Sequence, residues 1–122
     1  MAKHAPATVF ETTDHDAAGV AVARDAISSW LDTHGAGDGE RDALLLVATE
    51  LVTNAVCNTT GRVCVTVGEV FGGVKLQVFD ESLDLPASRL AMIAALAATW
   101  GTHPAIDADH VGKVVWATCR EG

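Results

Sequence analysis

The spacing of apolar residues along the first third of the chain predicts a short strand followed by two helices. Residues 8–12 alternate between apolar and polar side chains, which is typical of a strand at the edge of a sheet. Over residues 16–33 apolar residues recur at helical spacing and predict an amphipathic helix with Val20, Ala23, Ile27, Trp30 and Leu31 on one face. The glycine-rich residues 34–39 end this helix, and Asp38 is placed to cap a second one.

The middle of the chain predicts a β-hairpin. Residues 63–70 and 74–79 are rich in β-branched side chains. Phe71-Gly72-Gly73 lies between them and is a good turn signal, so we expect two adjacent antiparallel strands.

The last third predicts a helix, a loop and a strand. Pro86 suits the first turn of a helix that ends at Gly101 and has an apolar face of Leu90, Ile93, Leu96, Ala97 and Trp100. We expect residues 102–110 to form a loop and residues 112–119 a strand. Because helices and strands mix without a strict βαβ alternation, the order predicts an α+β fold with a mixed, mostly antiparallel sheet and helices on one face.

Composition narrows the class of protein. A chain of 122 residues can bury a core without disulfides or metals, so we expect one domain over residues 1–122. Its net charge is -8 and no Lys/Arg cluster occurs, which argues against direct binding of nucleic acid. The chain has no apolar run of membrane-spanning length and no secretory signal at its start, so we expect no membrane contact and a cytoplasmic location. Cys57, Cys64 and Cys119 have apolar neighbours and are predicted to be reduced core cysteines.

The second predicted helix carries a candidate site. Glu50 and Asn54 lie four residues apart, hence on one face of a helix that is otherwise largely apolar. In an ATP site, an amide oxygen can complete the shell of a magnesium ion, and a carboxylate one turn earlier can orient a nucleophile. Alternatively, both side chains bond to neighbouring backbone or meet water at the helix edge.

Four segments in the same order carry a resemblance to a known family. Residues 50–56 (ELVTNAV) match the N box of the histidine-kinase-like ATPases almost letter for letter. Val78-Phe79-Asp80-Glu81-Ser82 is similar to the next motif, whose aspartate accepts a hydrogen bond from the adenine amino group. Residues 96–101 and 112–116 are similar to a helix end and the last strand of that family. Nearly end to end, the chain resembles its small bacterial anti-sigma factors and serine kinases.

This resemblance implies a two-layer α/β sandwich of the Bergerat type, with ATP bound between helices and sheet. Carried over by position, Glu50 is the candidate general base, Asn54 the ligand of an ATP-bound magnesium ion and Asp80 the adenine reader. It also implies a protein partner, either a sigma factor or an anti-sigma antagonist, and relatives of this kind often form homodimers.

The segment that would hold the phosphates of ATP departs from the family pattern. Relatives have a longer lid that ends in a Gly-Arg-Gly-Leu type segment, where this chain has Ala87-Ser88-Arg89-Leu90. Residues with a β-carbon resist the close backbone approach that cradles phosphates, although Arg89 could contact phosphate instead. Val114 replaces a threonine that helps relatives bind adenine through water.

Three functions are therefore weighed. The leading hypothesis is a regulatory protein resembling an anti-sigma factor, which acts by binding a protein and has impaired or lost ATP binding, so that protein binding is favoured over kinase activity. The alternative is an active ATP-dependent serine kinase with a short lid. A third is that the fold serves an unrelated function.

Overall fold

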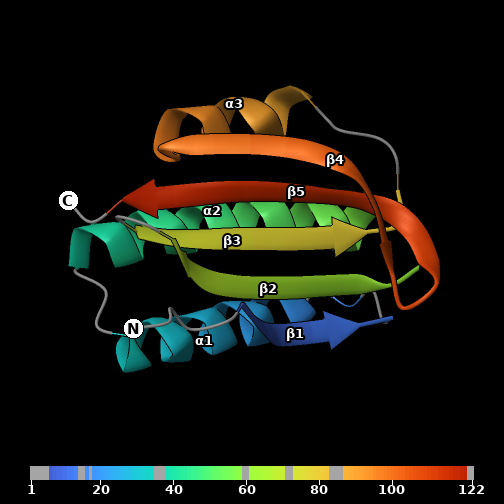
Figure 1. Ribbon diagram of the computed structural model, residues 1–122, viewed down its shortest axis with the longest axis horizontal. Coiled ribbons are helices and arrows are strands. Elements are labelled where there is room, and N and C mark those ends of the chain that lie inside the picture. Colours follow the sequence, from blue (N-terminus) through green and yellow to red (C-terminus); the bar gives the residue numbers. More distant parts are fainter. Residues whose placement is uncertain are drawn as a thin grey trace.

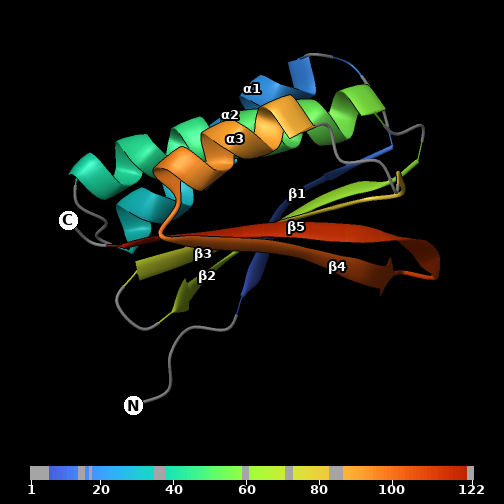
Figure 2. The ribbon, with the colours of Figure 1, turned by 90° about the horizontal axis from the view of Figure 1, so that it is seen from above.

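In the part of the chain that the structure describes, three helices lie on one side of a five-stranded sheet and make two layers (Figures 1 and 2). The computed structural model describes residues 6–13, 16, 18–34, 38–58, 61–70, 73–82 and 87–120. The strands are Ala7–Thr12 (β1), Val63–Val70 (β2), Gly73–Asp80 (β3), Thr99–Asp107 (β4) and His110–Arg120 (β5), and the helices are Ala18–Thr33 (α1), Asp38–Asn58 (α2) and Ala87–Leu96 (α3).

The sheet has the strand order β1-β2-β3-β5-β4. The mix of helices and strands confirms the predicted α+β class. Each neighbouring pair of strands is antiparallel, so the described sheet is antiparallel rather than mixed. The predicted edge strand is β1, and the predicted hairpin is β2 with β3.

The core lies between the helices and the sheet. Side chains alternate between the two faces of a strand, and the alternate valines Val63, Val65 and Val67 of β2 are fully buried on the helix side. From α1 the core takes four of the five predicted residues, namely Ala23, Ile27, Trp30 and Leu31. Helix α2 lies between α1 and α3 and contacts β3 and β5, which explains why it is apolar around most of its circumference.

The start of α1 has a capping side chain, because the Asp16 carboxylate accepts a 3.0 Å hydrogen bond from the Ala18 amide. Asp38, predicted to cap the second helix, is the first residue of α2, and its side chain lies outside what the structure describes. Pro86, expected in the first turn of the third helix, lies outside the described residues.

The prediction for the end of the third helix was wrong. Helix α3 ends at Leu96, and Trp100 belongs to β4. Residues 102–110, expected to be a loop, form most of β4, the turn and the start of β5. Proline and exposed polar residues are tolerated on an edge strand, and this composition hid β4.

The turn after β4 was also hidden by its sequence. Ala108 and Asp109 both have positive φ angles, 47° and 68°, as a two-residue type I′ hairpin requires. Such turns usually carry Asn-Gly or Asp-Gly, because alanine is strained in this conformation. A loop over residues 102–110 was therefore expected in place of a two-residue hairpin turn.

The three cysteines differ in their exposure. Cys64 and Cys119 are buried free thiols, as predicted, but Cys57 is exposed near the end of α2, so the prediction of a core position was wrong for it.

Among the described helices, none is both long and apolar enough to cross a membrane.

Candidate functional site

Asp80 is the last residue of β3, on the side of the sheet that faces the helices. In the strand register it is opposite Val63 of β2 and Lys113 of β5. Side chains at directly opposed positions point to the same face of a sheet. The register therefore sets a carboxylate beside an ammonium group in the helix-side layer.

Asp80 and Lys113 form a buried ion pair. The Lys113 Nζ atom lies 2.7 Å from Asp80 Oδ1, and the two residues are only 2% and 4% exposed. The Ser82 amide donates to the same Oδ1 atom at 2.8 Å, and Lys113 Nζ donates to the Ser82 carbonyl at 2.7 Å. The three residues thus close a polar network in which each charge has a partner.

Burial dominates the electrostatics of this network. It raises the pKa of the Asp80 carboxyl above its ordinary value, and the Lys113 ammonium and the Ser82 amide offset this only in part. The carboxylate therefore depends on Lys113 for its charged form.

Gly112 allows β5 to come this close. A Cβ atom at position 112 would overlap the carbonyl oxygen of Asp80 and contact the Glu81 backbone. A glycine is needed at this point of close approach, and it positions the next residue, Lys113, beside Asp80.

Sequence reasoning missed Lys113. A lysine at the start of the predicted, largely apolar strand 112–119 was the signal that could have revealed it. Its partner could not be read from the sequence, because Asp80 is 33 positions away and only the register of β3 with β5 brings the two together.

The other predicted site residues lie on helices α2 and α3. Asn54 is 5% exposed within α2, Glu50 is half-buried one turn earlier, and both take part in interactions within the structure. Arg89 falls in the first turn of α3, but its side chain lies outside what the structure describes. The described residues include no group of three or more His, Cys, Asp or Glu side chains that could hold a metal ion.

Comparisons with known proteins add no assignment. No family model matches the chain, and a search of the curated proteins finds no match either.

Proposed function

We propose that this protein is a regulatory protein that acts by binding another protein, on a histidine-kinase-like ATPase scaffold whose ATP binding is impaired or lost. Its proposed partner is a sigma factor or an anti-sigma antagonist. The proposal is supported by the order of the four family-like segments and by two layers in which Asn54 and Asp80 both lie within the helix–sheet interior.

The observation that carries the loss of ATP binding is the Asp80–Lys113 pair. An adenine-reading carboxylate must be open to the base, whereas Asp80 is 2% exposed and its Oδ1 atom already accepts from Lys113 and Ser82. Moving Lys113 aside would leave a buried ammonium without its counter-charge, which is costly. A base would thus have to reach a buried carboxylate and would compete with internal partners at Oδ1.

The segment that would cover the phosphates of ATP supports the same proposal. Only residues 81–86 separate β3 from α3, which is short for a lid, and the first turn of α3 carries no glycine. Without a lid the γ-phosphate is not sequestered from water, as transfer to an acceptor requires.

Isothermal titration with ATP and ADP, with and without magnesium, tests the loss of nucleotide binding. We expect no saturable heat. Micromolar affinity that disappears in Asp80→Asn would overturn this part of the proposal. Because Asp80→Asn disturbs a buried pair, Asn54→Ala is the second variant, and circular dichroism checks that both remain folded.

Size-exclusion chromatography in nucleotide-free buffer tests the binding function. We expect the protein to co-elute with a sigma factor or an anti-sigma antagonist encoded in the same genome, and added Mg-ATP should not change the complex. If none of the candidates co-elutes, the regulatory function is wrong, whatever the titration shows.

An active serine kinase is the second candidate function. It is favoured by one observation, the retention of Glu50 and Asn54 one turn apart on α2, with Asn54 in the helix–sheet interior. It predicts phosphorylation of a partner serine that Asn54→Ala abolishes.

A further inference from the structure

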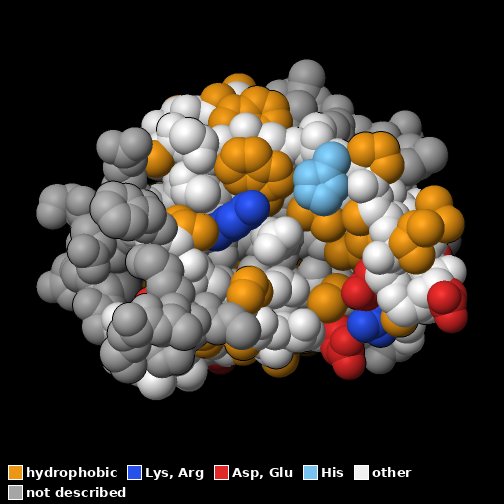
Figure 3. All heavy atoms as spheres, in the orientation of Figure 1, with side chains coloured by type: hydrophobic (Ala, Val, Ile, Leu, Met, Phe, Trp, Pro, Cys, Tyr) orange, Lys and Arg blue, Asp and Glu red, His pale blue; other side chains and the backbone are white. Residues whose placement is uncertain are grey.

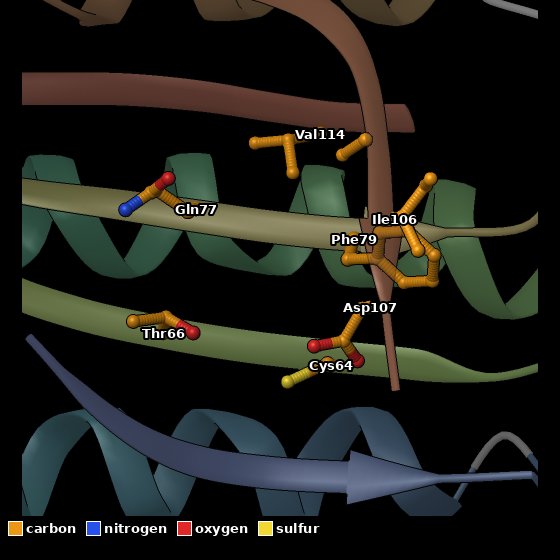
Figure 4. A pocket seen from close by; sticks show the side chains of 8 residues that line it. Cys64, Thr66, Gln77, Phe79, Ile106, Asp107 and Val114 are labelled. Carbon is orange, nitrogen blue, oxygen red and sulfur yellow. The ribbon is translucent and has the colours of Figure 1, made fainter. Parts of the chain in front are cut away.

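The end of the β4–β5 hairpin bends over the face of the sheet opposite the described helices. In the close view, the end of β4 passes in front of β3 and β2 (Figure 4). We call residues 105–107 of β4 the strap. Arg62 fastens it, since its Nε lies 2.5 Å from Asp107 Oδ2 and its second guanidinium nitrogen lies 2.6 Å from Glu11 Oε2 on β1.

A cavity lies between the strap and the sheet. Its volume is about 190 Å³, and its wall includes Cys64, Thr66, Gln77, Phe79, Asp107 and Val114. Figure 4 shows that these side chains come from β2, β3, β4 and β5. On the surrounding face most side chains are hydrophobic or uncharged, and acidic side chains gather near one end (Figure 3).

We propose that this cavity is a binding site for a small, neutral or cationic one-ring molecule that carries an amide-like pair of a hydrogen-bond donor and acceptor. The volume fits this class, because a cavity of roughly 150 Å³ is enough to hold benzene. Phe79 and Val114 supply the apolar wall against which a ring packs.

Two polar groups in the wall are available to such a molecule. Within the described part of the chain, the side-chain amide of Gln77 makes no hydrogen bond, so its N–H donors and its oxygen can pair with an amide of the ligand. The Asp107 carboxylate binds Arg62 through Oδ2, which leaves Oδ1 to accept from an N–H group.

The charge of the wall selects against anions. Of the described residues that line the cavity, none is Lys, Arg or His, and Asp107 is the charged one. A carboxylate or phosphate would meet the Asp107 carboxylate in the wall, whereas the Arg62 guanidinium that pairs with it is not among the residues that line the cavity. The site therefore differs in ligand class from a nucleotide site.

This site is also separate in space from the Asp80 network. In β3 the side chains of Gln77 and Phe79 point to the open face, whereas Val78 and Asp80 are on the helix side. The proposal is thus independent of whether ATP binds and of which protein is the partner.

Three matched probes test the proposal: benzamide is neutral, benzamidine is cationic and benzoate is anionic, and all have one ring. In ¹⁵N-resolved NMR titrations we expect benzamide and benzamidine to shift the amide signals of Thr66, Gln77 and Phe79 saturably, with dissociation constants on the order of 1 mM. Benzoate should bind roughly tenfold more weakly or not at all. Equal binding of benzoate, or no saturable shift with benzamide, overturns the proposal.

Variants and a thiol probe locate the binding. Gln77→Leu should weaken benzamide roughly fivefold, while Lys75→Gln, on the same face of β3 but outside the cavity wall, should leave binding unchanged. In a Cys57→Ser background, benzamide should slow the alkylation of Cys64 and leave that of the core thiol Cys119 unaltered. Equal protection of both thiols, or no effect of Gln77→Leu, contradicts binding under the strap.

Discussion

The ammonium nitrogen of Lys113 lies 2.7 Å from the Asp80 carboxylate, and both side chains are almost fully removed from water. The two residues come from neighbouring antiparallel strands and are directly opposed in the register. A buried ion pair gains little net free energy over apolar residues of the same shape, but breaking one is costly, because a lone charge remains buried. The stability of this protein and the state of its candidate site therefore depend on the same contact.

Removing one partner of this pair should be strongly destabilising. Lys113→Met leaves the Asp80 carboxylate buried without its cation, and we expect a loss of about 3–5 kcal/mol in the free energy of unfolding, measured with urea. The double variant Asp80→Leu/Lys113→Met should recover most of this loss. A change of less than about 1 kcal/mol in Lys113→Met would mean that the pair is not buried as described.

Glu81 should give the protein a stabilising contribution that disappears in acid. The Arg62 amide and the His110 side chain hold the pKa of Glu81 below its ordinary value of 4.5. Since the folded state favours the charged carboxylate, the contribution is fully present above about pH 4.5 and is lost as the pH falls through the lowered pKa of the folded state.

Urea unfolding of the wild type and of Glu81→Gln between pH 7 and pH 3 measures this contribution. Their difference in unfolding free energy should be constant at neutral pH and shrink in acid. Gly61→Ala is a second probe, because its Cβ would overlap the Glu81 carboxylate and push it away from the Arg62 amide. A difference that grows in acid would contradict the assigned direction.

Gly112→Ala should be much more damaging than Gly101→Ala. A Cβ at position 112 meets the backbone of Asp80, which cannot move without separating β5 from β3, and we expect a cost of about 3 kcal/mol or more. At position 101 the Cβ would lie 2.7 Å from the ring of Trp116, a half-buried side chain that can shift. Thermal unfolding of both variants checks the order, and equal melting temperatures would refute it.

Opening the strap should be a local event. The ion pairs of Arg62 lie at the surface, so Arg62→Met should hardly move the urea midpoint. It should nevertheless expose Cys64, whose thiol is slow to react because burial raises its pKa, and alkylation should accelerate severalfold. Arg41→Met, which breaks a pair with Asp32 in the helical layer, is the matched control and should leave the reactivity of Cys64 unchanged.

Local patterns were sufficient for the elements whose signals are strong. The apolar stripe of α1, the β-branched runs of the β2–β3 hairpin and the buried circumference of α2 all correspond to what the structure contains. Strand β4 was missed because an edge strand need not be apolar, and its turn was missed because Ala108 and Asp109 adopt positive φ without a glycine.

In the candidate site, too, some residues could be proposed from local motifs and others only from the structure. Glu50, Asn54 and Asp80 were proposed as site residues from motifs, since a motif is a local spacing of residue types, and their roles stay predictions. Arg89 stays untested, because its side chain lies outside the described residues. Neither the pairing of Lys113 with Asp80 nor that of Arg62 with Asp107 could be assigned in advance, because each joins residues that are distant in sequence.

The amino-acid sequence by itself determined the class of the fold, its helices and central hairpin, and the residue types of the candidate site, because periodicity and propensity act between neighbours in the chain. Only the tertiary structure decided that Asp80 is neutralised by Lys113 and that Asp107 closes a cavity over Gln77. Both contacts depend on the register and curvature of strands that are distant in sequence, and these are set by how the whole sheet packs against its helices.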